Sequence, residues 1–280
     1  MMKLFVAGGS GVIGREFLRL AVAAGHEVIG MTRSQRGVDV IRALGGAPVV
    51  ADALDGDEVA DAVGAARPDA VVNLLTDLAS GDLASNAQLR IVGTRHLVDA
   101  AMKARVETIV AESISWVYPS SAEFATEETP LDLEAPEPRL RTVRAIARLE
   151  EVVREMPRSV VLRFGQLYGD GTWFSRDGRY GIAAREGRMP ATRTVASFIH
   201  VEDAARAAFL ALGWPSGTWN IVDDEPARGT EWAPVFAGAV GAPRPSPEES
   251  DDPGRPVSNR RAHESGLVLT RPTWRTGFAE

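Results

Sequence analysis

Three glycines near the N-terminus are the first residues whose type and spacing could do chemistry. The segment VAGGSGVIGREF places Gly8, Gly11 and Gly14 at intervals of three, between an apolar run and an amphipathic stretch. Glycines permit a tight turn and let a phosphate approach the backbone. The first turn of the helix that follows offers free N–H groups and a favourable dipole to that phosphate. The segment therefore predicts a site for the pyrophosphate of a dinucleotide.

Arginines rather than carboxylates follow the next apolar run. The segment GMTRSQRG holds Thr32, Arg33 and Arg36 in the region where a site that prefers NAD carries an acidic residue for the ribose hydroxyls. A guanidinium pairs well with a 2′-phosphate, and Arg15 could add further charge, so the pattern favours NADP over NAD. The alternative is that these are ordinary surface arginines, because Arg greatly outnumbers Lys in this chain.

Asp52 completes the expected cofactor site. It follows the run APVVA and could accept a hydrogen bond from the adenine amino group, or it could be only the N-cap of a helix beginning near residue 55. The residues expected to contact the cofactor are Gly8, Gly11, Val12, Ile13, Gly14, Thr32, Arg33, Arg36, Asp52, Ala53, Leu74 and Leu75.

The elements that must position these residues alternate along the first half of the chain. Short apolar runs such as KLFVA, EVIGM, APVVA and DAVVNLL alternate with amphipathic stretches of helical length. This alternation predicts right-handed βαβ units and a doubly wound, parallel α/β sheet of the Rossmann type. We expect a dinucleotide-binding domain over residues 1–164 and a smaller substrate-binding lobe over residues 165–280, interleaved with the sheet.

The composition excludes several other classes of function. The 280 residues include no Cys, 45% are hydrophobic and the net charge is -7. Disulfides and thiolate chemistry are therefore absent, and the charge does not suit nucleic acid. No spacing of His, Asp and Glu suggests a metal site, no run is long enough to span a bilayer, and the N-terminus lacks the layout of a signal peptide. We expect a cytoplasmic protein that acts on a small molecule, without nucleic-acid or membrane partners.

A series of short motifs runs through most of the chain. It comprises GGSGVIG, DALD, VVNLLT, IVGTRHLVDAA, VAESISWVYP, VLRFGQLYGDG, SFIHVEDAARAA and TWNIVDDEP. In this order the motifs resemble the extended short-chain dehydrogenase/reductase superfamily, specifically its NAD-dependent epimerase/dehydratase-like branch. The resemblance implies a Rossmann fold and a nucleotide cofactor.

The resemblance also implies a catalytic Tyr-x-x-x-Lys pair, which this chain lacks. When Glu150 is aligned with the Glu that follows the family Lys by four residues, Thr142 and Ile146 occupy the Tyr and Lys positions. The stretch TVRAIARLEE contains neither Tyr nor Lys, and an Arg guanidinium is a poor proton shuttle at neutral pH. Any catalytic proton must come from elsewhere.

Hydroxyl groups after the fifth expected strand are the predicted replacements. The family holds substrate there with a Ser or Thr, and the segment SISWVY supplies Ser113, Ser115 and Tyr118 as catalytic candidates. Ser113 could instead cap a loop, and Tyr118 could be a packing residue of a turn. Asp77, after the fourth expected strand, could be a base or a solvated loop carboxylate.

The favoured activity is NADP-dependent hydride transfer to or from a small carbonyl or hydroxyl compound, in specialised metabolism. Trp116, Trp173 and Phe198 suggest a pocket for a weakly polar substrate, or else the core of the second lobe. Two other functions stay open: a redox-neutral epimerase, dehydratase or cyclase, and a dinucleotide-sensing binding protein without catalysis. The helices expected near 84–104 and 140–155 suit pairing in a homodimer, although the same faces could pack only on the sheet.

Overall fold

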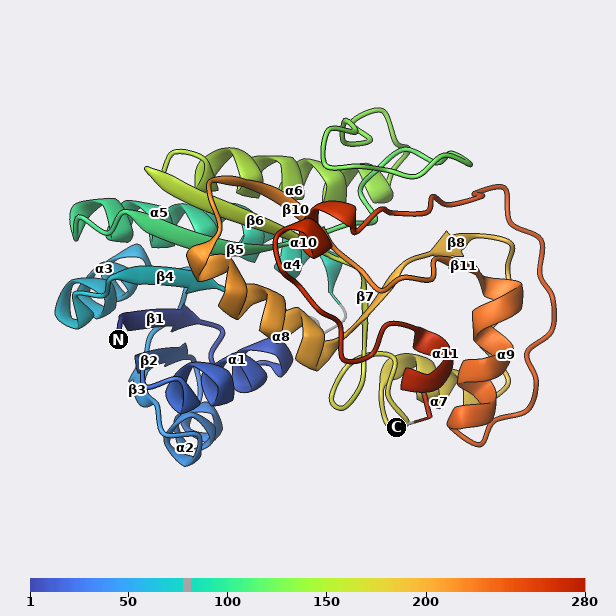
Figure 1. The fold of residues 1–280 in the computed structure, drawn as a ribbon, viewed down its shortest axis with the longest axis horizontal. Helices are drawn as coiled ribbons and strands as arrows, with labels where there is room; N and C mark the ends of the chain where they lie inside the picture. The colour runs from blue at the N-terminus through green and yellow to red at the C-terminus, as the bar shows by residue number, and fades with distance from the viewer. Residues whose placement is uncertain (78–81, 280) are drawn as a thin grey trace. The chain divides into compact units, whose positions relative to one another are not determined.

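The computed structural model describes residues 1–77 and 82–279, and Figure 1 shows its fold. Its largest sheet has seven strands in the order β10-β6-β5-β4-β1-β2-β3. β3, β2, β1, β4 and β5 pair in parallel. The strands are β1 Lys3–Ala7, β2 Glu27–Thr32, β3 Ala47–Val50, β4 Ala70–Asn73, β5 Thr108–Ile114, β6 Arg158–Phe164 and β10 Gly217–Ile221. The predicted α/β fold with a parallel Rossmann-type sheet is confirmed.

Contacts divide the chain into two compact units. The first unit comprises residues 1–113, 132–162 and 205–218, and the second comprises residues 114–131, 163–204 and 219–280. Each unit is thus assembled from three stretches of chain. The functional division at residues 164 and 165 stays a prediction.

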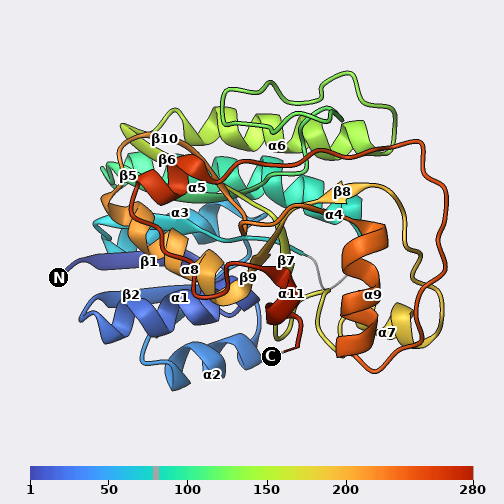
Figure 2. The same cartoon turned by 45° about the vertical axis from the view of Figure 1, so that its right-hand side comes forward.

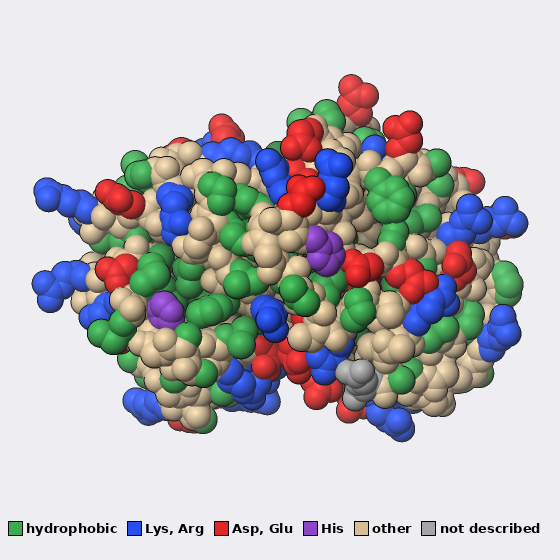
Figure 3. Space-filling view, viewed as in Figure 1, with side chains coloured by type: hydrophobic (Ala, Val, Ile, Leu, Met, Phe, Trp, Pro, Cys, Tyr) green, Lys and Arg blue, Asp and Glu red, His purple; other side chains and the backbone are tan. Residues whose placement is uncertain are grey.

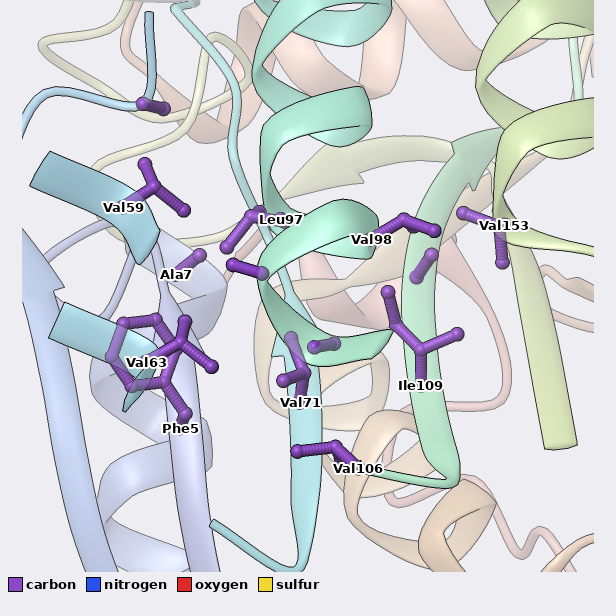
Figure 4. Close-up of a cluster of buried hydrophobic side chains, with 14 of the residues drawn as sticks. Phe5, Ala7, Val59, Val63, Val71, Leu97, Val98, Val106, Ile109 and Val153 are labelled. Atoms are coloured by element: carbon purple, nitrogen blue, oxygen red, sulfur yellow. The ribbon is translucent and has the colours of Figure 1, made fainter. Parts of the chain in front are cut away.

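The core of the first unit follows from the alternation of its strands. Phe5 and Ala7 of β1 point to the same face of the sheet, because side chains alternate along a strand. They pack in a cluster with Val59 of α3, Leu97 of α5 and Val153 of α6 (Figure 4). Figures 1 and 2 show α1 and α2 together beside β1 and β2. The helices of this unit include α1 Val12–Ala23, α2 Gln35–Ala43, α3 Gly56–Ala66, α4 Leu83–Gln88, α5 Thr94–Lys103 and α6 Arg139–Val153.

The helix expected near 84–104 contains an irregular turn. α4 leads into a π-helical segment, η1 Leu89–Gly93, which leads directly into α5. The caps between these segments are all in right-handed helical conformation. A π turn inside a helix widens it locally and is frequent at functional sites. The residues of this turn are therefore candidates for a role in the functional site.

Aromatic side chains fill the core of the second unit. Phe174 stacks on Tyr180 with ring centroids 4.4 Å apart, and Phe198 lies edge-on to Phe174 at 5.1 Å. Phe198 is fully buried, so it belongs to the core and not to the surface of a pocket. The unit contains β7 Gln166–Tyr168 paired with β9 Phe198–His200, and β8 Val195–Ala196 paired with β11 Ala227–Arg228. Its helices include α7 Arg179–Arg185, α9 Gly229–Ala239, α10 Arg260–Glu264 and α11 Trp274–Gly277, and α8 Val201–Leu210 begins in it.

The surface is mixed in charge. Figure 3 shows acidic and basic side chains interspersed on one face of the protein. No helix within residues 1–77 and 82–279 combines the length and hydropathy needed to cross a membrane. Within the same ranges, no group of three or more His, Asp or Glu side chains is arranged to hold a metal ion.

Candidate dinucleotide site and its surroundings

The N-terminal glycines form a tight turn between β1 and α1. Gly8 has a φ of 83°, and a Cβ added to it would lie 2.5 Å from the carbonyl oxygen of Leu74. A Cβ on Gly14 would lie 2.1 Å from the carbonyl oxygen of Gly8. Gly11 is the N-cap of α1 and offers no capping side chain, so the first-turn N–H groups of residues 12–14 have no helical acceptor. A cradle that side chains would fill, lined by free N–H groups, fits a pyrophosphate.

A hydroxyl cluster follows β2 beside this turn. The Oγ atoms of Ser10 and Thr32 lie 3.1 Å apart. Ser34 caps α2 by accepting a hydrogen bond of 3.1 Å from the Gly37 backbone N–H. A Cβ on Gly37 would lie 1.9 Å from Oγ1 of Thr32. Glycine is therefore required here, because the start of α2 packs directly on Thr32.

Arg33 and Arg36 flank the start of α2. Both side chains are exposed, and neither forms an ion pair with a residue that the structure describes. The positive end of the helix and two uncommitted guanidinium groups make this corner suitable for an anion.

Asp52 lies beyond the end of β3 and does not cap α3. The N-cap of α3 is Asp55, whose Oδ1 accepts hydrogen bonds from the N–H groups of Asp57 and Glu58. Asp52 accepts instead from the N–H of Leu54 at 3.0 Å, within its own loop. The interpretation of Asp52 as the N-cap is therefore wrong, and its carboxylate retains acceptor capacity for a ligand. The neighbouring Ala53 is buried.

The end of β4 is fixed by an amide side chain. Asn73 donates a hydrogen bond of 3.1 Å to Oγ1 of Thr94 in α5 and accepts one from the N–H of Leu75. Leu74 is buried and Leu75 is half-buried. Asp77 is also half-buried, and its N–H donates to Oδ1 of Asn86 at 3.1 Å. Because a Cβ on Gly8 would meet the carbonyl oxygen of Leu74, this edge of the sheet lies directly beside the glycine turn.

The helix that lacks the Tyr and Lys is α6. Thr142 and Ile146 are both buried in it. Ser113, at the end of β5, donates a hydrogen bond of 2.8 Å to Oε1 of Glu150, whose other oxygen accepts from Arg154 at 2.8 Å. The Ser113 hydroxyl is thus committed to a buried carboxylate of α6.

The other two hydroxyl candidates belong to the second unit. The Tyr118 hydroxyl donates to Oδ1 of Asn220 at 2.6 Å and accepts from the Arg163 guanidinium at 2.7 Å. Burial raises the pKa of Tyr118, and the charge of Arg163 acts in the opposite direction. Ser115 is buried, and its backbone N–H donates to the carbonyl of Phe164 at 2.8 Å. Tyr118 is therefore held in a buried polar cluster, and a catalytic role for these hydroxyls stays a prediction.

Sequence reasoning missed two buried charges of the first unit. Arg90 lies in η1 and Glu112 lies in β5, and both are buried. Burial raises the pKa of Glu112 to about 7, and the positive charge of Arg90 acts against that rise. Burial also lowers the pKa of Arg90, opposed by the charge of Glu112. The signal in the sequence is a carboxylate inside a strand, TIVAESI, whose other residues are all uncharged.

The fold and the glycine cradle together define a dinucleotide-binding α/β protein. The model of the NAD dependent epimerase/dehydratase family matches residues 4–221, and the chain belongs to this family. A 3-diazoavenalumate denitrifying reductase from a Streptomyces species is 37% identical over 306 aligned positions, covering 99% of each chain.

Solved structures of the same fold are more distant in sequence. WbmG of Bordetella bronchiseptica, solved in complex with NAD, has a TM-score of 0.82 at 20% identity and matches 99% of this chain and 92% of its own. UDP-glucose 4-epimerase of Thermus thermophilus, also solved with NAD, has a TM-score of 0.78 at 22% identity and matches 99% of this chain and 97% of its own. At this level of identity the likeness establishes the fold.

Proposed function

We propose that this protein is an NADPH-dependent reductase that removes N₂ from a small diazo compound in its diazonium form. The full-length relative supports the substrate class, because its name describes a reductase that denitrifies a diazo compound. The observation that carries the proposal is the composition of α6, where Thr142 and Ile146 stand in place of a Tyr and a Lys.

The chemistry of a diazonium group explains why that pair is dispensable. A carbonyl that accepts hydride becomes an alkoxide and needs a proton donor, which is the task of a general acid. A diazonium ion that accepts hydride needs none: R–N₂⁺ and H⁻ give R–H and N₂, as the C–N bond breaks and a C–H bond forms. The bound cofactor would supply the hydride and leave as NADP⁺. Charge and atoms balance without an acid or base from the protein.

The cofactor preference rests on the corner at the start of α2. Arg33 and Arg36 are exposed and have no ion pair within the described residues, and the segment GMTRSQRG contains no carboxylate. A 2′-phosphate would find two charged donors and the positive end of α2. These features favour NADP over NAD.

The roles of Ser113, Ser115 and Tyr118 change under this proposal. As hydroxyl donors they would be essential for a carbonyl substrate and only orienting groups for a diazonium substrate. Ser113 already donates to Glu150, and Tyr118 already donates to Asn220. These bonds fit a supporting role better than that of a proton source.

The test uses purified protein, NADPH and a carboxylated arenediazonium salt. We expect oxidised NADPH, released N₂ and the denitrified arene in equal amounts. Deuterium from NADPH labelled at C4 should appear in the new C–H bond. Heat-denatured protein with the same reagents measures the uncatalysed reaction.

Three outcomes would contradict the proposal in different ways. Turnover of aldehydes or ketones, without turnover of the diazonium salt, would favour the hypothesis of a carbonyl or hydroxyl substrate. Product formation without net NADPH oxidation would indicate a redox-neutral enzyme. Cofactor binding with no turnover of any of these compounds would favour a binding protein.

A further inference from the structure

Two opposite charges are buried in the first unit. The Arg90 side chain lies in the π turn η1 and the residue is 6% exposed, whereas Glu112 lies in β5 and is 8% exposed. Among residues 1–77 and 82–279, no side-chain hydrogen bond or ion pair joins either of them to another residue. Each influences the pKa of the other, so they are near one another without being in contact.

Such an arrangement is costly unless a ligand completes it. Removing a guanidinium from water without replacing its hydrogen bonds is strongly unfavourable, and Arg carries five N–H donors. A buried charge pair repays its desolvation only when hydrogen bonds satisfy the remaining donors and acceptors. The described chain does not supply them, and the polar atoms of Arg90 and Glu112 are not among its fully enclosed atoms that lack a partner. The pair can therefore accept a ligand that both donates and accepts hydrogen bonds.

The strand register places Glu112 at the cofactor edge of the sheet. Asn73 of β4 is opposite Ala111 of β5, so Glu112 is level with Leu74. The carbonyl oxygen of Leu74 lies 2.5 Å from the position of a Cβ on Gly8. Glu112 is therefore one strand away from the residue that touches the glycine turn.

Arg90 reaches the same edge from the helix. Thr94, about one helical turn after Arg90, accepts a hydrogen bond from Asn73 at the end of β4. The π turn thus lies where the helix is fastened to the end of β4. The anion-binding corner of Arg33 is on the opposite side of the glycine turn, after β2. A dinucleotide with its phosphates on the turn and its adenosine toward β2 must extend its other half toward β4 and β5.

We propose that Arg90 and Glu112 bind the nicotinamide nucleoside half of the cofactor, through its ribose hydroxyls and carboxamide. These groups both donate and accept hydrogen bonds, as a site made of one cation and one carboxyl group requires. Thr142 and Ile146 of α6 offer no charge for this task. The inference rests on the proposed nicotinamide cofactor but is independent of the substrate.

The experiment compares two ligands by calorimetry. NADPH contains the nicotinamide half, whereas adenosine 2′,5′-bisphosphate lacks it. For Arg90→Met and Glu112→Gln, we expect NADPH to bind about tenfold or more weakly, the effect of losing a hydrogen bond to a charged group. The affinity for adenosine 2′,5′-bisphosphate should not change.

Two control variants define the range of the measurement. Arg33→Ala should weaken both ligands, because both carry the 2′-phosphate. Arg148→Met replaces an exposed arginine of α6 that pairs with Glu151, and should weaken neither. Glu112→Gln preserves side-chain shape, so it tests the inference even if Arg90→Met fails to fold.

Three results would overturn the inference. They are unchanged NADPH affinity in Glu112→Gln, unchanged NADPH affinity in a folded Arg90→Met, and an equal loss of both ligands in either variant. If the unaltered protein prefers NADH, the same comparison runs with NADH and ADP, and only the cofactor preference fails. A lack of diazo turnover leaves the binding test unaffected.

Discussion

The Ser113 hydroxyl donates a hydrogen bond of 2.8 Å to Oε1 of Glu150, joining the end of β5 to the last turn of α6 inside the first unit. Glu150 is 1% exposed, and its second oxygen accepts from the half-exposed Arg154. The carboxylate thus receives one neutral and one charged donor. The sequence predicts Ser113 as a substrate contact, and the structure shows it in contact with Glu150.

Ser113→Ala should destabilise the fold. It removes a donor from a buried carboxylate, which typically costs about 1–3 kcal/mol. Chemical unfolding of the variant and the unaltered protein would measure the difference. The Ser121 hydroxyl accepts from an exposed loop N–H, that of Glu123, so Ser121→Ala should stay within about 0.5 kcal/mol of the unaltered protein. Equal stability of the two variants would show that the Glu150 bond contributes little.

Tyr118→Phe separates a structural role from an acid role. The change removes the donor to Asn220 and leaves the Arg163 guanidinium without that acceptor, so we expect a loss of about 1–3 kcal/mol in stability. Single-turnover hydride transfer to a diazonium substrate should keep nearly its normal rate. A fall of about 10²–10⁴-fold in that rate, with intact NADPH binding, would show that the reaction depends on the Tyr118 hydroxyl and would contradict a hydride transfer that needs no acid.

Arg33→Ala should reduce the preference for NADPH. A charge-assisted contact to the 2′-phosphate is worth roughly 1.5–3 kcal/mol, so the unaltered protein should bind NADPH at least about tenfold more tightly than NADH. The variant should lose most of that ratio while its affinity for NADH changes little. Equal affinities in the unaltered protein, or a ratio that survives the substitution, would refute the assignment.

Glu112 should make stability depend on pH. Its pKa is raised from 4.5 to about 7 in the folded protein, so the folded protein holds this proton more tightly than the unfolded chain. The free energy of unfolding should therefore fall as the pH rises from about 4.5 to about 7 and then level off, by roughly 3 kcal/mol in total. Below the unfolded pKa the carboxyl group is neutral in both states and has no such effect.

Glu112→Gln should remove this fall, since a neutral amide does not titrate. The measurement is urea unfolding of both proteins at about pH 5 and about pH 8, without cofactor. The difference between the two proteins isolates Glu112 from other titrating groups. Parallel pH curves would mean that the Glu112 carboxyl group does not have the raised pKa.

Gly37→Ala should damage the cofactor corner. An added Cβ would lie 1.9 Å from Oγ1 of Thr32, so either the start of α2 or Thr32 must move. A loss of about 1–3 kcal/mol in stability is typical of such overpacking, and NADPH binding should weaken. The matched change is Gly64→Ala in α3, where an added Cβ meets nothing within 4 Å and should stabilise by up to about 1 kcal/mol. Chemical unfolding and NADPH titration of both variants would measure the changes in stability and in cofactor affinity.

The order of strands and helices, the glycine turn and the absence of Tyr and Lys from α6 could all be predicted from the sequence. Each depends on residues that are close together along the chain, such as Gly8 and Gly14, or on the alternation of apolar runs. Local patterns of this kind predict the local backbone structure and show which catalytic residue types are absent, because neither depends on how the elements pack together.

The partners of the charged and hydroxyl groups were decided only by tertiary structure. Ser113 and Glu150 are 37 residues apart, and Tyr118 and Asn220 are 102 residues apart. Arg90 and Glu112 come from a helix and a strand whose nearness depends on the π turn and on the register of β5 with β4. Burial and hydrogen-bond partners are properties of packed surfaces. The sequence therefore identified the groups that could react, and packing determined which of these groups hydrogen-bond to one another.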